Sequence, residues 1–215
     1  MKKETQKEIL SSLFVRKATP EDVHAIVPLI HSSGPKAWEY VFTEAGLQSI
    51  DFLKSAYLQR GNTISYTNHY VAVLENRVVG SILCYKQPKF IILTLGTFIR
   101  ICISYGINFL KVTKRGLEVE TMIQPPKWGR LYLAHIAVSP ETRNRGIAKQ
   151  MVRYVIKNET RSKTISLDVS IENEPAIKLY QNLGFVVKET RKLKNNALSI
   201  PNHHYMEVDS SSIKI

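Results

Sequence analysis

One short basic stretch has the residue types and spacing of an anion-binding loop: Arg143, Asn144, Arg145, Gly146, Ile147 and Ala148. Glycine at its fourth position lets several backbone N–H groups converge on one point, and a helix that follows adds the positive end of its dipole. A pyrophosphate binds such a loop without a metal. Taken alone, the spacing is equally typical of a structural turn between a strand and a helix.

The neighbouring segments place this stretch between a strand and a helix. Residues 131–138 form a nearly continuous apolar run, which is typical of a central strand covered on both faces. After the stretch, apolar residues recur with helical spacing at Ile147, Met151, Val152 and Val155. We therefore expect the stretch to begin a helix just beyond the end of a buried strand.

The same periodicities predict the remaining elements. Further strands are expected over residues 13–17, 70–74, 78–85, 164–170, 185–189 and 204–208. Further helices are expected from Pro20 to just before residues 32–35, within residues 38–58, and over residues 174–183. Gly46 should interrupt the second helical region, Gly80 marks a bulge in its strand, and Gly184 should cap the last helix.

Length and composition limit the class of protein. The chain has 215 residues, of which 44% are hydrophobic and 22% charged, so we expect one folded domain over residues 13–208. Residues 1–12 are then an N-terminal extension and residues 209–215 a C-terminal tail. The two cysteines, Cys84 and Cys102, stand in apolar surroundings and suggest neither a disulfide framework nor a metal site. A reducing, cytoplasmic location fits best, and the charged N-terminus lacks the apolar core of a secretory signal.

The formal net charge of +12 favours a polyanionic partner, which could be nucleic acid, an anionic membrane or a phosphorylated cofactor. The basic residues between 143 and 163 surround the proposed loop and therefore favour the cofactor. Aromatic residues do not interleave with the basic clusters as in RNA-binding modules, so nucleic acid is not expected.

One apolar segment, residues 90–110, is about as long as a bilayer span and contains a single charge, Arg100. The central arginine, two glycines and folded sequence on both sides favour a buried or partner-facing helix over a true span. Basic residues flank the segment, which favours weak association with a membrane or protein surface through residues 90–110. These flanking residues are Lys86, Lys89, Lys111, Lys114 and Arg115.

Two ordered blocks of sequence resemble the GCN5-related N-acetyltransferase (GNAT) family. Residues 136–148, IAVSPETRNRGIA, match the family pattern A/V-V-x-P-x-x-R-x-x-G-x-G/A. Residues 173–185, NEPAIKLYQNLGF, match its pattern N-x-x-A-x-x-L-Y-x-x-x-G-F. The order of predicted elements also fits, so the resemblance implies an α/β (α+β) fold with a mixed, mostly antiparallel central sheet and helices on both faces.

The resemblance also implies a reaction and a binding site. The reaction is acetyl transfer from acetyl-CoA to a primary amine of a small molecule, peptide or protein, by direct attack in a ternary complex and without a metal. Main-chain groups of Ile136, Ala137 and Val138 would meet the pantetheine arm. The pyrophosphate would be held by Arg143, Asn144, Arg145, Gly146, Ile147, Ala148 and Lys149.

Two residues of the second block would complete the cofactor site. Asn173 would steady the pantetheine or its neighbouring helix, and its side chain also suits a helix N-cap. Tyr180 would donate a proton or hydrogen bond to the departing CoA thiolate, although its spacing from Ala176 alone is more typical of a core tyrosine.

The general base is where this chain departs from the family pattern. The family often has a carboxylate or histidine four or six residues before the final valine of the strand, where this chain has Ala134 and Tyr132. His135 is adjacent, but strand alternation puts it on the opposite sheet face unless a bulge reverses it. Other candidate bases are Glu39, Glu44, Glu172, His203 and His204.

The missing base keeps a second function open, namely an acyl-CoA-binding regulatory or interaction module with little turnover. The acceptor regions, residues 38–58 and the apolar segment, match the family least. The oligomeric state also stays open, a dimer included.

Overall fold

The computed structural model describes residues 12–159, 162–193 and 200–213. Within them, seven strands form one sheet in the order β1-β2-β3-β4-β5-β7-β6, and only β4 and β5 are parallel. The strands are β1 (Phe14–Lys17), β2 (His69–Leu74), β3 (Arg77–Tyr85), β4 (Arg130–Val138), β5 (Thr164–Ser170), β6 (Val186–Arg191) and β7 (His203–Asp209). The expected mixed, mostly antiparallel sheet is confirmed.

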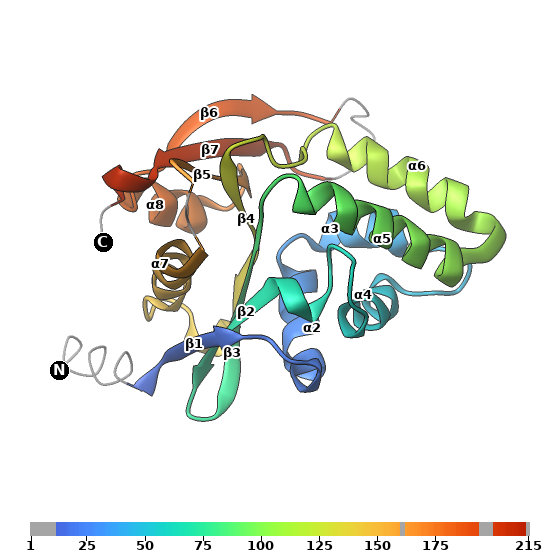
Figure 1. Ribbon diagram of the computed structural model, residues 1–215, viewed down its shortest axis with the longest axis horizontal. Helices are drawn as coiled ribbons and strands as arrows, with labels where there is room; N and C mark the ends of the chain where they lie inside the picture. The colour runs from blue at the N-terminus through green and yellow to red at the C-terminus, as the bar shows by residue number, and fades with distance from the viewer. Residues whose placement is uncertain (1–11, 160–161, 194–199, 214–215) are drawn as a thin grey trace.

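Helices cover both faces of the sheet (Figure 1). One face carries α2 (Val23–Ser32), α3 (Pro35–Phe42), α4 (Ser49–Leu58), α5 (Lys89–Tyr105) and α6 (Phe109–Glu120). The other carries α7 (Ile147–Glu159) and α8 (Glu174–Asn182). Short 3-10 turns are η1 (Pro20–Asp22), η2 (Tyr66–Asn68), η3 (Gly106–Asn108), η4 (Pro140–Thr142) and η5 (Ser210–Ser212).

Two hydrophobic cores result from the alternation of side chains along the central strands. Leu131 and Leu133 of β4 pack toward α7, where Met151 is fully buried. On the opposite face, Val71 of β2 packs with the α2 residue Ile26. Because both faces of the central strands are covered, their sequences are apolar without alternation. Ile213, in the segment expected to be a tail, also packs in the core beside α7 and α8.

Local sequence signals explain where several elements begin and end. The Thr19 backbone N–H donates to the Asp22 carboxylate at 2.8 Å, which fixes the turn at Pro20 that leads into α2. The helical region after residue 34 is broken into α3 and α4, with Gly46 between them at a φ of 83°. The Phe185 N–H donates to the Tyr180 carbonyl and closes the end of α8 around Gly184.

The apolar segment differs most from its prediction. It forms α5, turns at η3, and packs against α6 as a helical hairpin beside the sheet (Figure 1). Of the two alternatives, a buried or a partner-facing helix, full burial is wrong, because Ile92 is 67% exposed and Ile103 is 65% exposed. The sequence predicted a helix but did not show which of its sides would meet the domain. Contact with a partner stays a prediction.

Candidate active site

The centre of the sheet opens between β4 and β5. The two strands pair only from Arg130 to Leu133 on β4 and from Thr164 to Leu167 on β5. Beyond this point β4 stays paired with β3, while β5 stays paired with β7. In the described ladder the β5-facing edge of residues 134–138 therefore has no strand partner, and its main-chain groups are available to an extended ligand. The predicted pantetheine contacts, Ile136, Ala137 and Val138, lie on this edge.

The basic loop lies directly beyond the open strand edge. After η4 the chain turns through Asn144 at a φ of 61° and Gly146 at a φ of 82°, and α7 begins at Ile147. The Gln150 N–H donates to the Gly146 carbonyl at 3.1 Å, which makes it an early hydrogen bond of the helix. Helix geometry therefore leaves the preceding N–H groups, including that of Ile147, directed out of the helix toward the loop. This is the geometry of an anion site.

The groups around the loop are basic. Arg143 and Arg145 are exposed, and Lys149 lies on the first turn of α7. The Arg143 guanidinium donates from Nε to the Val138 carbonyl at 3.3 Å, which ties the loop to the end of β4. An open strand edge and a basic helix N-terminus thus form one continuous surface. Residues 136–138 and 143–149 of the predicted cofactor site lie on it, whereas Asn173 and Tyr180 belong to the second sequence block.

The second sequence block lies on α8. Asn173 caps this helix, because its side-chain oxygen accepts the Ala176 N–H at 3.2 Å. The cap is therefore confirmed, while a pantetheine contact stays a prediction. Tyr180 is 5% exposed and packs edge-on against Phe185, with ring centroids 5.8 Å apart. Burial raises the pKa of the Tyr180 hydroxyl, so it stays protonated at neutral pH and able to donate.

A bulge in β4 decides which way His135 points. Ser81 is opposite Ala137 and Leu83 is opposite Ala134, so two residues of β4 face a single residue of β3. His135 adopts a φ of 49° at this bulge. Simple alternation is therefore wrong here, because the bulge turns His135 onto the face covered by α2 to α6. There its ring packs edge-on against Trp38 of α3, at a centroid distance of 5.2 Å.

His135 is linked to a second histidine. His69 Nδ1 lies 3.0 Å from the Ser65 carbonyl oxygen. Because a carbonyl oxygen can only accept a hydrogen bond, Nδ1 of His69 carries the hydrogen and Nε2 is left as an acceptor. His135 Nδ1 lies 3.4 Å from His69 Nε2 and must then carry the proton of this long hydrogen bond. The unprotonated atom of His135 is consequently Nε2. Nothing in the sequence near His69 indicated this pairing.

Burial keeps both rings neutral. It lowers the pKa of His69 to about 4, against a smaller opposing effect of the Ser65 hydrogen bond. It also lowers the pKa of His135 to about 3, to which the neighbouring His69 contributes. At neutral pH the hydrogen-bonded pair of His69 and His135 therefore has one unprotonated nitrogen outside its own hydrogen bonds, His135 Nε2.

A family model described as the acetyltransferase (GNAT) family matches residues 36–185. The chain belongs to this family. It is therefore an acetyltransferase, and the family uses acetyl-CoA as co-substrate with an amine acceptor. The resemblance inferred from the two sequence blocks is confirmed.

Solved structures agree on the fold of this GNAT protein. An N-acetyltransferase from Staphylococcus aureus Mu50 is 22% identical, with 91% of this chain and 100% of that chain covered and a TM-score of 0.64. A GCN5-related N-acetyltransferase from Kribbella flavida is 18% identical over 93% and 98% of the two chains, with a TM-score of 0.56. Ard1 from Thermoplasma volcanium is 16% identical over 92% and 97%, with a TM-score of 0.54. A search of curated proteins finds no significant match.

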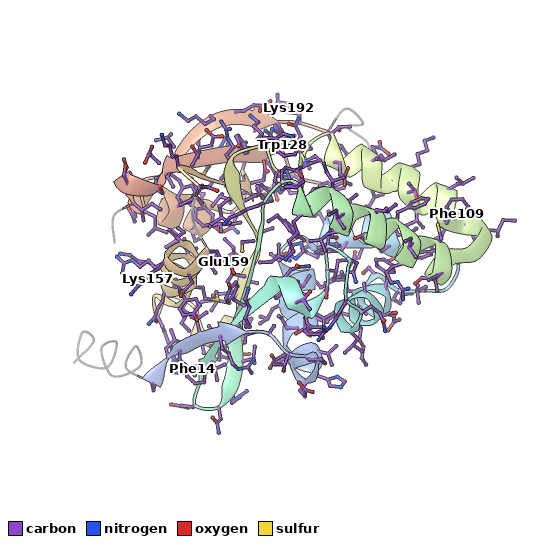
Figure 2. The ribbon with its side chains drawn as sticks, in the orientation of Figure 1. Phe14, Phe109, Trp128, Lys157, Glu159 and Lys192 are labelled. Carbon is purple, nitrogen blue, oxygen red and sulfur yellow. The ribbon has the colours of Figure 1, made fainter. Side chains whose placement is uncertain are left out.

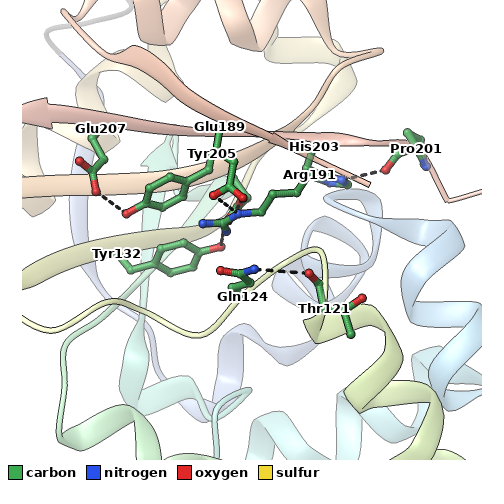
Figure 3. A network of polar contacts seen from close by, with 10 residues as sticks. Thr121, Gln124, Tyr132, Glu189, Arg191, Pro201, His203, Tyr205 and Glu207 are labelled. Atoms are coloured by element: carbon green, nitrogen blue, oxygen red, sulfur yellow. Dashed lines mark hydrogen bonds and ion pairs between the residues drawn. The ribbon is translucent and has the colours of Figure 1, made fainter. Parts of the chain in front are cut away.

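The position where GNAT enzymes often carry a base is linked here to a carboxylate on the next strand. Tyr132 donates its hydroxyl to Asp168 of β5 at 2.9 Å, and Arg191 lies 3.3 Å from the other carboxylate oxygen. Figure 3 shows Tyr132, Arg191 and Tyr205 close together. Burial raises the pKa of the Asp168 carboxyl to about 6, against the opposing effects of Arg191 and Tyr132. The sequence analysis missed Asp168, whose only signal is a charge inside an otherwise apolar strand.

The other candidate bases of this GNAT protein have different partners. Glu44 pairs with Lys111 and Arg115 of α6 at 2.8 Å and 3.0 Å. His203 Nδ1 lies 2.9 Å from the Pro201 carbonyl. His204 Nδ1 lies 2.9 Å from the Thr190 hydroxyl, and Glu172 is exposed. These contacts favour structural or surface roles, and His135 is the candidate that the fold brings to the sheet centre.

A groove of about 830 Å³ lies on the far side of α3 from Trp38. It is lined by His31, Lys36, Glu39, Tyr40, Thr43, Gln48, Ser49, Ile50, Arg115 and Ile200. Glu39 lies 3.7 Å from His31, and the Tyr40 hydroxyl donates to Glu118 of α6 at 2.7 Å. Helix α3 therefore contacts His135 through Trp38 and lines this polar groove with its other side.

Proposed function

We propose that this protein transfers the acetyl group of acetyl-CoA to a primary amine of a small molecule, peptide or protein, by direct attack in a ternary complex. The observation that carries the proposal is the opening between β4 and β5. It is bordered by a basic helix N-terminus at one end and by the bulged His135 on the strand that forms its edge.

Two segments of the chain bind different parts of acetyl-CoA. Main-chain groups of Ile136, Ala137 and Val138 hold the pantetheine arm, and residues 143–149 hold the pyrophosphate at the start of α7. Bound in this way, acetyl-CoA supplies an activated carbonyl and a thiolate leaving group. Binding of both substrates on one rigid sheet replaces a bimolecular encounter and lowers the entropic part of the barrier.

The transfer forms a C–N bond and breaks the C–S bond of the thioester. The amine nitrogen becomes positively charged as it attacks, and the proton that it must lose passes through His135 Nε2 to solvent, because burial lowers the pKa of His135 too far for the ring to keep the proton at neutral pH. A backbone N–H on the open edge of β4 stabilises the negative charge on the carbonyl oxygen. The Tyr180 hydroxyl donates a hydrogen bond or proton to the departing sulfur. His69 acts as a positioning residue, because it fixes the tautomer of His135.

The alternative is a binding module that holds acyl-CoA with little turnover. A CoA-release assay with acetyl-CoA over a panel of amines, polyamines and peptides separates the two functions. The assay is run beside a thermal shift with CoA. Release that depends on one class of amine supports the enzyme, whereas stabilisation by CoA without amine-dependent release supports the module.

A further inference from the structure

The outward side of the α5–α6 hairpin is an exposed apolar surface. We call it the outer hairpin face, and its members are Ile91, Ile92, Leu95, Ile99, Ile103, Ile107, Leu110 and Leu117. Their exposed fractions run from 47% at Ile99 to 92% at Ile107, which lies in the turn η3. Apolar side chains gathered on one continuous surface in this way are typical of an interaction site.

The inward side of the hairpin is already fixed to the domain. Leu93, Ile101 and Tyr105 are buried, and the Tyr105 hydroxyl donates to the Phe42 carbonyl at 2.5 Å. These buried positions are spaced by eight and four residues, so they form one stripe of α5, and the exposed stripe lies across the helix from it. The outer hairpin face therefore cannot turn inward without breaking existing packing.

A close backbone contact adds to this attachment. Gly96 lies so near the Gly61 backbone that an added Cβ would stand 1.7 Å from the Gly61 oxygen. The hydroxyl of Thr97 accepts the Thr63 N–H at 2.9 Å, one residue further along α5. The hairpin is thus held in place along its length, and what its outer face meets must come from outside the described chain.

Basic residues flank or interrupt the apolar residues of the hairpin in sequence. They are Lys86, Lys89, Arg100, Lys111, Lys114 and Arg115, and the sequence has no Asp or Glu between Arg77 and Leu117. Lys86 donates to the Glu159 carbonyl of α7. Lys114 follows Leu110 by four residues and precedes Leu117 by three, so all three lie on one stripe of α6. Lys111 and Arg115 pair with Glu44, whereas Lys114 is exposed beside the apolar residues.

We propose that the outer hairpin face binds the surface of a bilayer that contains anionic lipids. An apolar helical surface edged by lysine and arginine matches the boundary between acyl chains and negatively charged headgroups. Ile107 and its neighbours at the far end of the hairpin, where Figure 2 labels Phe109, enter the bilayer boundary first. This proposal is independent of the proposed acetyl transfer.

The hairpin lies on the bilayer and does not cross it. By length and composition, Lys89–Glu120 is the one stretch among the described residues that could cross a membrane. Helix α5 itself has 17 residues, about 25 Å, which is shorter than a typical hydrocarbon core. If α5 crossed the bilayer, the buried side chains of Leu93, Ile101 and Tyr105 would also lose their packing in the core. A second copy of the chain is a poorer partner, because two such basic faces repel each other.

Vesicle flotation tests this proposal with the full chain. The wild type is mixed with vesicles of phosphatidylcholine alone or of phosphatidylcholine with one-third phosphatidylglycerol. We expect binding to the anionic vesicles, which weakens as salt is raised. Replacement of one inserted isoleucine by serine should weaken binding about tenfold, so the variant I92S/I103S/I107S should remain unbound. The substitution Lys114→Glu should weaken binding by about fivefold or more for each unit of charge changed.

Two controls keep the test independent of folding and of acetyl transfer. Val186→Ser removes an exposed valine from β6, on the opposite side of the molecule, and should bind vesicles like the wild type. The thermal shift with CoA reports whether each variant keeps its fold and cofactor site. The proposal is overturned by equal binding to both vesicle types, or by unchanged binding of the triple variant. It is also overturned if the triple variant turns a wild-type dimer into a monomer while no form binds vesicles.

Discussion

The proposed donor half and the proposed acceptor half of this acetyltransferase are built in different ways. The proposed donor half consists of main-chain groups from one continuous stretch, the end of β4, the basic loop and the first turn of α7. The proposed acceptor half consists of side chains from separate segments, with His69 on β2, His135 on β4 and Trp38 on α3. The proposed donor site therefore follows from backbone geometry, while the proposed acceptor site depends on how distant strands and helices meet.

The largest effect is expected from Tyr180, the residue proposed to donate to the leaving group. Tyr180→Phe should lower kcat by roughly a hundredfold or more, since it removes a donor at the departing sulfur. Its thermal shift with CoA should match the wild type, because the ring still fills the same space beside Phe185. Steady-state CoA release together with that shift is the measurement. A kcat equal to that of the wild type would mean that the Tyr180 hydroxyl does not take part in the reaction.

The next effect concerns the base. His135→Gln should lower kcat by about ten- to a hundredfold near neutral pH. Gln keeps a polar side chain of similar size in the bulge, so the fold and the affinity for CoA should be retained. If the activity of His135→Gln equals that of the wild type over the whole pH profile, a group other than His135 accepts the proton. Asp168→Asn, assayed in parallel, reports whether the buried carboxylate takes that role.

A smaller effect is expected from the positioning histidine. His69→Leu removes the acceptor that holds His135 Nδ1–H and should lower kcat by about tenfold, the loss expected from one misdirected hydrogen bond. His69→Gln offers a side-chain oxygen at a similar distance and should restore most of that rate. If kcat falls equally in both variants, the loss reflects packing in the core and not the loss of the hydrogen bond between His69 and His135.

The smallest effect is on stability. The unfolded chain binds protons on His69 below its ordinary pKa of 6.5, whereas the folded chain does so only near 4, so the free energy of unfolding falls as pH drops between these values. The loss from His69 should reach about 2 kcal/mol at pH 5. Asp168, whose pKa is raised to about 6, acts in the opposite direction over nearly the same interval.

Urea unfolding of the wild type and of His69→Gln at pH 7 and pH 5 isolates the histidine, because the Asp168 contribution is common to both proteins. The wild type should lose more free energy of unfolding than the variant between the two pH values. Equal losses would mean that His69 is not buried as a neutral ring.

The donor half could be predicted from the sequence because its signals are local. The loop pattern around Gly146, the cap at Asn173 and the end of α8 at Gly184 each depend on residues within a few positions. The strands around them were correctly predicted from apolar runs. The bulge at His135 was not predicted, because nothing in the residues around it indicates one. Such a one-residue irregularity reverses which side chains face the acceptor.

The acceptor half could not be predicted because its contacts join segments far apart in the chain. His69 and His135 are 66 residues apart, and Tyr132 reaches Asp168 from 36 residues away. Both contacts depend on strand order and register. The hairpin shows a related limit, because the length and apolar composition of residues 90–110 indicate a helix but do not tell whether its apolar residues meet the core or the solvent.

The central claim is that acetyl-CoA binds where β4 and β5 part, with its pyrophosphate at the start of α7. Calorimetric titration of CoA into Gly146→Val tests it most directly, since a β-branched side chain at a φ of 82° strains the loop and obstructs the approach of phosphate. Gly129→Val is the matched control, because Gly129 has a φ of 74° but lies outside the loop. We expect Gly146→Val to lose at least about tenfold in affinity for CoA, while Gly129→Val binds CoA like the wild type. Equal affinities in the two variants, or no binding by the wild type, would contradict it.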